Sequence, residues 1–292
     1  MGPIAQSVEQ RTFNPWVDGS SPSGPTYKVT SLKLFESEGK MSNKSFESYA
    51  YIYDAFYIDK NYKKECENLF GIAKSLTKKL DYGIEIGAGS GTFTKELAKY
   101  LQHVEAFELS PVMAEICANN LSKFQSITVN QGDLKQTLNS SIEINSIDLV
   151  IANFHVFTYF SEKEISQFVD ASVKFLRVGG IVSFDFWDLQ AVCAAPPVQV
   201  VKVAHIEGKE ITRKTIPQAS NDFREIKVNF EFYESSNLLF TETHVMHPKS
   251  LEEVKGFFAA NFEFCGSYDI TSGKEYSQKN YGNLVYFRKM KD

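Results

Sequence analysis

The sequence contains no apolar run of membrane-spanning length and no long run of lysine and arginine. A spanning helix needs about 18 or more consecutive apolar residues, and no stretch of the 292 residues approaches that length. Phosphate binding needs a basic face, whereas the formal net charge is -5. We therefore expect a cytoplasmic protein whose partners include neither a membrane nor nucleic acid.

Cysteine is also scarce. The four cysteines are Cys66, Cys117, Cys193 and Cys265, about 50 to 75 residues apart. None forms a C-x-x-C pair with the spacing of metal ligands. We expect reduced thiols of a cytosolic protein and no metal site.

The first 40 residues lack any regular pattern. Residues 2–26 read "GPIAQSVEQRTFNPWVDGSSPSGPT", with no basic segment before an apolar core, so they do not predict a signal peptide. The stretch resembles the peptide obtained when a bacterial tRNA gene is translated. We expect residues 1–40 to be a disordered or spurious extension, with the native chain starting at Met41; mass spectrometry of the native protein decides this.

From residue 63 onward, strand and helix patterns alternate. Helices are expected at 63–80, 92–101, 111–121 and 162–176, the last ending at the glycines of "RVGG". Strands are expected at 82–86, 103–108, 126–130, 147–152 and 180–186. This alternation predicts an α/β fold with a Rossmann-like, doubly wound, mostly parallel sheet over residues 41–190 and 250–292.

Between these two segments the sequence predicts strands without helices, at 199–206, 209–217, 223–234 and 237–247. Apolar and polar residues alternate from Ile226 to Tyr233, and "ESSN" then supplies turn chemistry. We expect an antiparallel β lobe over residues 199–248. A helix at 250–260 and strands at 262–270 and 282–288 return to the main sheet.

The segment "YGIEIGAGSG" (82–91) places Gly87, Gly89 and Gly91 between the first strand and a helix. Glycine permits a sharp turn and lets a ligand approach bare backbone. Glu108 ends the second strand, where a carboxylate accepts two hydrogen bonds from a ribose diol. Together these residues indicate a cofactor that contains adenosine.

The spacing of the glycines selects among such cofactors. The dinucleotide fingerprint is G-x-G-x-x-G, and Thr92 stands where its third glycine would be. Glu85, just before the loop, suits an ammonium group better than a phosphate, although it also suits a role in organising the loop backbone. A ligand with adenosine at one end and an amino acid at the other is S-adenosylmethionine.

Five segments in order then resemble the motifs of class I S-adenosylmethionine-dependent methyltransferases: "EIGAGSG", "FELSPVMAEICANN", "VNQGDL", "IDLVIANFHVFTYF" and "FLRVGGIVSFDFW". They cover about residues 82–187. The resemblance implies contacts for each part of the cofactor. The methionine part contacts Gly87, Ala88, Gly89 and Gly91, and the ribose binds Glu108. The adenine lies by Leu109, Met113, Asp133 and Leu134, and the sulfonium lies by Asn153 and Phe154.

A looser resemblance connects "YIYDAFY", "ANFHVFTYF" and "ETHVMH" to bacterial N-methyltransferases of nucleotide-linked amino sugars. It implies that a tyrosine-rich segment with Tyr53 and Tyr57 closes over the donor and that the β lobe forms the acceptor side. His155 and Tyr57 are then the candidates for base or orienting group. Ordinary packing roles stay open for all three residues.

Two further pairs of side chains are not expected to form a shared site. His244 and His247 fall three apart on a predicted strand and so face opposite sides. Asp185 and Asp188 flank "FW" after the fifth strand. We expect solvated loop acids, and a contact with an acceptor hydroxyl or ammonium group stays open.

The sequence thus predicts a methyltransferase for a small acceptor, such as the amine of a nucleotide-linked amino sugar. Another small metabolite as acceptor, or a non-catalytic S-adenosylmethionine-binding module, stays open. The incomplete fingerprint disfavours a nicotinamide oxidoreductase. "ANFH" in place of an N/D-P-P-Y motif disfavours a protein or RNA methyltransferase. The acceptor, the number of methyl groups and the oligomeric state are left open, and a homodimer is compatible with the sequence.

Overall fold

The computed structural model describes residues 41–42, 46–278 and 281–291. The predicted extension over residues 1–40 lies outside them. The chain divides into two compact units, each of which is discontinuous in sequence. Unit 1 holds the described residues up to Lys60 together with Ala195–Met246, and unit 2 holds Asn61–Ala194 and the residues from His247 onward.

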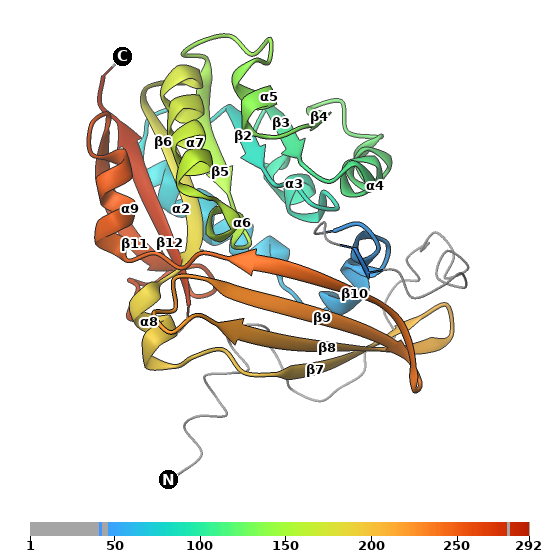
Figure 1. The fold of residues 1–292 in the computed structure, drawn as a ribbon. Helices are drawn as coiled ribbons and strands as arrows, with labels where there is room; N and C mark the ends of the chain where they lie inside the picture. Colours follow the sequence, from blue (N-terminus) through green and yellow to red (C-terminus); the bar gives the residue numbers. More distant parts are fainter. Residues whose placement is uncertain (1–40, 43–45, 279–280, 292) are drawn as a thin grey trace. The chain divides into compact units, whose positions relative to one another are not determined.

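Unit 2 is built on a seven-stranded sheet (Figure 1). In sheet order its strands are β11 (Phe262–Asp269), β12 (Gly282–Lys289), β6 (Leu176–Trp187), β5 (Ile147–Ala152), β2 (Tyr82–Ile86), β3 (His103–Glu108) and β4 (Ile127–Gln131). The five strands from β6 to β4 are parallel, and β12 and β11 are antiparallel to their neighbours. The predicted Rossmann-like, mostly parallel sheet is therefore confirmed.

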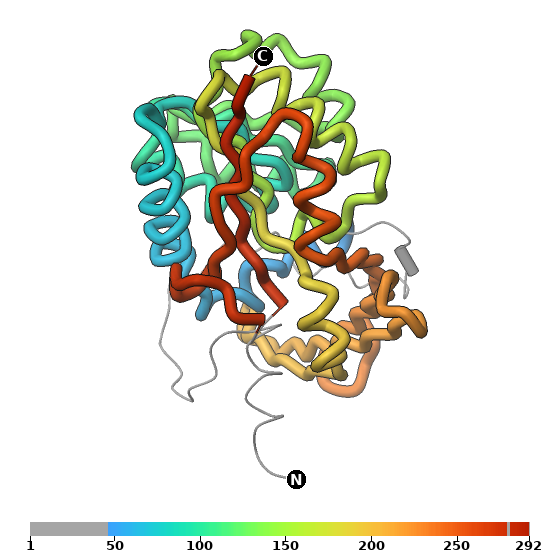
Figure 2. The backbone as a smooth tube through the Cα atoms, turned by 90° about the vertical axis from the view of Figure 1, so that its left-hand side faces the viewer, coloured from blue at the N-terminus to red at the C-terminus, as the bar shows by residue number. Residues whose placement is uncertain are grey.

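Helices cover both faces of this sheet. One face carries α2 (Tyr62–Leu76) and α3 (Thr92–Leu97), with α4 (Pro111–Leu121) beside α3; the other carries α5 (Leu134–Leu138), α7 (Glu162–Phe175) and α9 (Leu251–Phe258). Figure 2 shows α2 and α9 on opposite sides of the strands. Two short helices, α6 (Val156–Tyr159) and α8 (Leu189–Ala194), follow β5 and β6.

The strands of the sheet interior are apolar on both faces. In β5, Leu149 and Ile151 pack in the core cluster of α2 and α3, whereas Val150 and Ala152 pack in that of α7 and α9. Successive side chains of a strand point to opposite faces, so a strand covered on both sides reads as a continuous apolar run. This explains the unbroken "LVIA" of β5.

The boundary between α7 and β6 differs from the prediction. The glycines of "RVGG" (177–180) lie inside β6 and do not end the preceding helix, because α7 stops at Phe175 and the strand begins at Leu176. Two other helices are shorter than predicted, since α2 ends at Leu76 and α3 at Leu97. Helices α5, α6 and α8 were not predicted.

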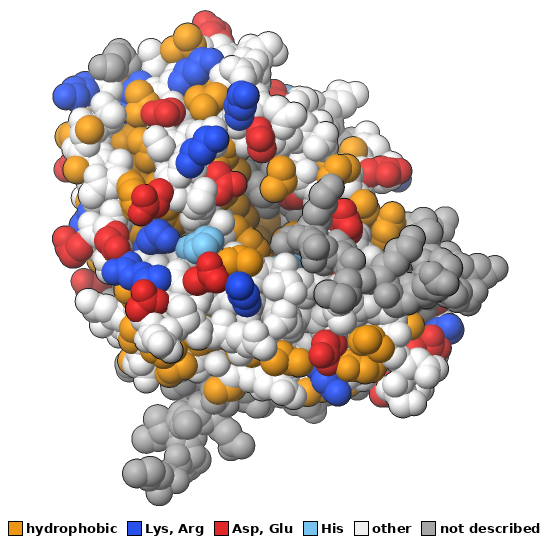
Figure 3. All heavy atoms as spheres, in the orientation of Figure 1, with side chains coloured by type: hydrophobic (Ala, Val, Ile, Leu, Met, Phe, Trp, Pro, Cys, Tyr) orange, Lys and Arg blue, Asp and Glu red, His pale blue; other side chains and the backbone are white. Residues whose placement is uncertain are grey.

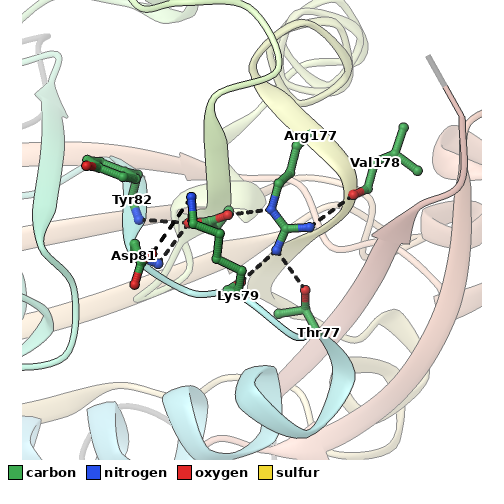
Figure 4. Close-up of polar contacts among 7 residues, drawn as sticks. Thr77, Lys79, Asp81, Tyr82, Arg177 and Val178 are labelled. Carbon is green, nitrogen blue, oxygen red and sulfur yellow. Dashed lines mark hydrogen bonds and ion pairs between the residues drawn. The ribbon is translucent and has the colours of Figure 1, made fainter.

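Arg177 explains the early start of β6. Its Nε lies 2.5 Å from Oδ1 of the buried Asp148, and it also donates to the Lys79 carbonyl. The other carboxylate oxygen of Asp148 accepts the backbone N–H groups of Asp81 and Tyr82 at 2.8 and 3.0 Å. This network, drawn in Figure 4, ties the amino ends of β2, β5 and β6 together.

Unit 1 contains a second sheet. Its order is β1 (Met41–Ser42), β10 (Asn237–Met246), β9 (Ile226–Glu234), β8 (Lys209–Ala219) and β7 (Val200–Ile206), with β7 to β10 antiparallel and β1 parallel to β10. The 3₁₀ helices η2 (Tyr49–Ile52) and η3 (Asp54–Phe56) belong to the same unit. The predicted four-stranded antiparallel arrangement is confirmed.

Two charged residues are buried inside unit 1. Glu242 of β10 accepts the backbone N–H groups of Phe46 and Tyr49, at 2.8 and 2.7 Å. Arg213 of β8 donates to the hydroxyl groups of Tyr49 and Tyr57. Both contacts fix the tyrosine-rich segment within this unit.

Candidate active site

The three glycines of the loop after β2 have different neighbours. All three adopt left-handed backbone, with φ of +74° at Gly87, +58° at Gly89 and +83° at Gly91. A Cβ at Gly87 would meet Val156 Cγ2 at 2.5 Å, and one at Gly91 would meet Leu121 Cδ1 at 2.7 Å. A Cβ at Gly89 would meet nothing within 4 Å. Gly87 and Gly91 therefore permit close packing, and Gly89 presents bare backbone to open space.

Glu108, the last residue of β3, connects this loop to the neighbouring strand. Its Oε2 accepts the Gly89 N–H at 2.8 Å and its Oε1 accepts the Ser110 N–H at 2.9 Å. Burial raises the pKa of Glu108, and the backbone N–H groups of Ser110, Gly89 and Leu109 partly oppose the shift. A carboxylate has about four acceptor positions, so Glu108 keeps acceptor capacity for a ribose hydroxyl group.

Buried polar atoms without partners lie at the ends of β2 and β5. Among the described residues, nothing hydrogen-bonds to Oε2 of Glu85 or to either amide atom of Asn153. Burial raises the pKa of Glu85 to about 8, with the Thr94 side chain opposing the shift and the charge of Glu108 adding to it. Because buried polar groups are normally paired, these atoms fit a ligand with an amino-acid end.

The residues predicted to surround an adenine have mixed surroundings. Leu109 is exposed, whereas Met113 and Leu134 are buried. Asp133 caps α5: its carboxylate accepts the Gln136 N–H at 2.8 Å, and the Gln136 side chain accepts the Asp133 N–H at 2.6 Å. Asp133 thus has a local structural role, and its contact with adenine stays a prediction.

The segment after β5 is strained and carries a histidine beside a buried acid. Phe154 and His155 have φ of +59° and +65°, a left-handed backbone conformation that residues other than glycine rarely adopt. Nδ1 of His155 lies 2.6 Å from Oδ2 of Asp185, and the His155 backbone N–H donates to Oδ1 at 3.0 Å. Strain of this kind clusters at functional sites.

The expectation that Asp185 and Asp188 are solvated loop acids is wrong. Asp185 lies within β6, and both carboxylates are buried. Asp188 accepts the N–H groups of Gln190 and Ala191 at the start of α8, at 2.9 and 3.2 Å. The alternation of "FDFW" places its members on opposite faces of a strand, so the pattern contained a signal that this strand extends to Trp187.

The predicted tyrosines lie in unit 1. The rings of Tyr53 and Tyr57 are 4.6 Å apart between centroids. Arg213 Nη1 lies 3.3 Å from the Tyr57 hydroxyl. Burial raises the pKa of Tyr57, but the charge and hydrogen bonds of Arg213, with a bond to Tyr49, outweigh this and lower it. Sequence reasoning missed Arg213, and the roles of both tyrosines toward a cofactor stay predictions.

The loop after β2 and the segment after β5 flank the position where the strand order reverses. The chain passes from β2 to β3 and β4 in one direction and from β5 to β6 in the other. In open α/β sheets, ligands bind outside the carboxyl ends of the strands at this position. A family model described as a methyltransferase domain matches residues 84–180.

Residues 84–180 are a methyltransferase domain. The match confirms the predicted resemblance to class I S-adenosylmethionine-dependent methyltransferases and, with it, S-adenosylmethionine as the cofactor. The methyltransferase domain contains the glycine loop, Glu108, Asn153 and His155. Asp185 and unit 1 lie outside it.

Similar proteins extend this result. Phosphoethanolamine N-methyltransferase 1 of Zea mays is 36% identical over 101 residues, which are 35% of this chain and 20% of that protein. The match thus spans about a fifth of the length of the curated relatives. None of the helices in the described part of the chain is both long and apolar enough to cross a membrane.

Solved structures show the same fold. A methyltransferase from Clostridium acetobutylicum matches with a TM-score of 0.68 and 15% identity, over 85% of this chain and 100% of that one. The sugar N-methyltransferase KedS8 from Streptoalloteichus matches with a TM-score of 0.67 and 16% identity, over 94% and 100%. The class I methyltransferase fold is therefore confirmed.

Proposed function

We propose that the protein transfers a methyl group from S-adenosylmethionine to the amine of a small molecule, with a nucleotide-linked amino sugar as the favoured acceptor. The observation that carries the proposal is the set of groups at the reversal of strand order. Bare backbone at Gly89, the carboxylate of Glu108 and the unpaired atoms of Glu85 and Asn153 all lie at carboxyl ends of parallel strands.

These residues suit the two ends of the cofactor. Glu108 would hold the ribose, Glu85 the ammonium group, and Gly89 the methionine backbone. When bound, S-adenosylmethionine supplies an electrophilic methyl carbon, to which an amine nitrogen bonds while the carbon–sulfur electron pair returns to sulfur as the thioether. The protein then has to orient the amine, exclude water and accept one proton.

His155 is the proton acceptor that we propose. It follows β5 in the strained segment beside Asn153, and its side chain is partly exposed while Asp185 beside it is buried. A neutral imidazole accepts a proton near neutral pH. Tyr57 is the second candidate for an orienting group.

Two relatives support an amine as acceptor. The maize protein and KedS8 are both named as N-methyltransferases, the first of phosphoethanolamine and the second of a sugar. On the face shown in Figure 3, basic and acidic side chains are interspersed and do not gather by sign. That face gives no support to a polyanionic acceptor.

Calorimetric titration with S-adenosylhomocysteine tests the cofactor site. We expect Glu108→Ala to weaken binding by about 1–3 kcal/mol, because it leaves the ribose hydroxyl groups unpaired. Glu105→Ala is the matched control, since this carboxylate lies on the same strand and bonds to His103 and Asn130. Undiminished affinity of Glu108→Ala would contradict the site.

Turnover assays test the reaction. We expect mass spectrometry to detect a methylated product from at least one nucleotide-linked amino sugar or small primary amine. Another small metabolite as the acceptor would appear as product from a different member of the panel. Binding of S-adenosylhomocysteine without turnover of any acceptor would indicate a non-catalytic module.

A further inference from the structure

The carboxylate of Asp185 contacts both the backbone and the ring of His155. Oδ1 accepts the His155 N–H at 3.0 Å, and Oδ2 lies 2.6 Å from Nδ1. The Asp185 side chain is 1% exposed and that of His155 is 29% exposed. A buried carboxyl group therefore lies against a ring that solvent, and so a reactant, can reach.

The backbone contact holds a conformation that is otherwise unfavourable. Phe154 and His155 both have positive φ, and such strain persists only where surrounding structure fixes it. Trp187 lies two residues beyond Asp185 on β6, hence on the same side of the strand. Its ring packs edge-on against the imidazole, with 5.9 Å between centroids.

We infer that Asp185 is a positioning residue for proton transfer through His155, an inference that rests on the proposed function. Nδ1 is buried beside the carboxylate, 2.6 Å from Oδ2 although not aligned for a hydrogen bond, which leaves Nε2 as the nitrogen that accepts a proton. The lone pair of the acceptor amine forms the bond to carbon, and one N–H proton of the amine passes to Nε2 while the electron pair of that N–H bond stays on nitrogen. The Asp185 carboxylate offsets the charge that the ring gains.

A double-mutant cycle on kcat tests this inference. At saturating S-adenosylmethionine, we expect Asp185→Asn to lower kcat roughly tenfold, which lies within the coupling of about 2- to 150-fold between residues in contact. Neither KM should change much. In the His155→Gln background, the same substitution should change kcat less than about twofold. Equal losses in both backgrounds would mean that Asp185 acts independently of His155 and would overturn the inference.

Asp188→Asn is the matched control. It neutralises another buried carboxylate immediately after the same strand, but its partners are the N–H groups at the start of α8 and the Asn283 side-chain amide. We expect any loss of kcat in this variant to be the same with His155 and with Gln at position 155. If the loss of kcat in Asp188→Asn depends on residue 155 as strongly as the loss in Asp185→Asn does, the coupling is not specific to Asp185 and the inference is overturned.

Urea denaturation midpoints of the same four proteins test the contact without any acceptor. We expect the losses from Asp185→Asn and His155→Gln to be non-additive, since each removes the same interaction. Additive midpoints would overturn the contact and the inference with it. If the four midpoints are non-additive but the wild type methylates no amine, the contact stands and the proposed function fails. If the wild type is active but the kcat losses are additive, the proposed function stands and the inference fails.

Discussion

Neighbouring glycines of the loop after β2 serve separate purposes. The backbone at Gly87 turns against Val156 of α6, and the backbone at Gly91 turns against Leu121 of α4. Gly89 has no such neighbour, and its N–H is held by Glu108. A single residue type therefore provides close packing at two positions and access for a ligand at a third.

Alanine substitutions should separate these purposes. We expect Gly87→Ala to lower the free energy of unfolding by about 2–4 kcal/mol, from left-handed strain and overpacking against Val156. Gly89→Ala should lower it by only about 1–2 kcal/mol, from strain alone, and should weaken binding of S-adenosylhomocysteine. Urea denaturation and calorimetry measure the two effects, and equal stability losses would contradict this division.

Glu85 should make stability depend on pH. Burial raises its pKa in the folded protein to about 8, from 4.5 in the unfolded chain. The folded protein therefore binds the proton more tightly between these values, so this residue's contribution to stability falls as pH rises from about 4.5 to 8. We expect Glu85→Gln to become progressively more stable than the wild type over that window, with a constant difference above it. Urea titrations at pH 5, 7 and 9 check this, and a difference independent of pH would refute it.

At the scale of single elements, the amino end of β6 is held by charge. Burial raises the pKa of Asp148, but Arg177 and the N–H groups of Asp81 and Tyr82 outweigh this effect and hold the pKa below its usual range. The carboxylate thus stays ionised while its side chain is fully buried. This network fixes the start of β6 at Leu176, directly after α7 ends at Phe175.

Removing the Arg177 guanidinium should destabilise the folded protein. We expect Arg177→Met to lower the free energy of unfolding by about 3 kcal/mol, because it leaves Asp148 buried without its cation. Lys255→Met is the comparison, since its ion pair with Glu252 is exposed and contributes about 0.5 kcal/mol or less. Similar losses in both variants would contradict the assignment.

Periodicity predicted most elements because their apolar patterns are long. The strands β2, β3 and β5 begin and end where the sequence indicates. Helices α5, α6 and α8 have four to six residues, too few to show a helical period. The partners Asp185 and Arg213 depend on contacts 30 and more than 150 residues away in sequence, which no local pattern records.

At the scale of the whole molecule, the hydrophobic clusters of unit 2 are self-contained. Their buried members all come from residues 66–186 and 254–287. The chain leaves unit 2 after α8 and returns at His247. The two places are joined, since Leu189 N–H donates to the Lys249 carbonyl at 2.9 Å and Lys249 N–H donates to the Trp187 carbonyl at 3.1 Å.

Unit 2 should therefore fold alone. We expect residues 61–194 joined to 247–292 by a short Gly-Ser linker to unfold cooperatively and to bind S-adenosylhomocysteine. In this shortened chain, Glu108→Ala should again weaken binding by about 1–3 kcal/mol. Circular dichroism and calorimetry measure both properties. A chain that is unfolded, or folded without affinity, would show that unit 1 is needed for the cofactor site.

Glu242 gives the tyrosine-rich segment of unit 1 a fixed origin. Its one carboxylate accepts the N–H groups of Phe46 and Tyr49, and the chain then runs on to Tyr53 and Tyr57. A substitution of Glu242 would therefore affect the positions of both tyrosines although Glu242 contacts neither side chain in these hydrogen bonds. Where related sequences keep a carboxylate at position 242, we therefore expect the segment that leads to Tyr53 and Tyr57 to be held at the same starting point.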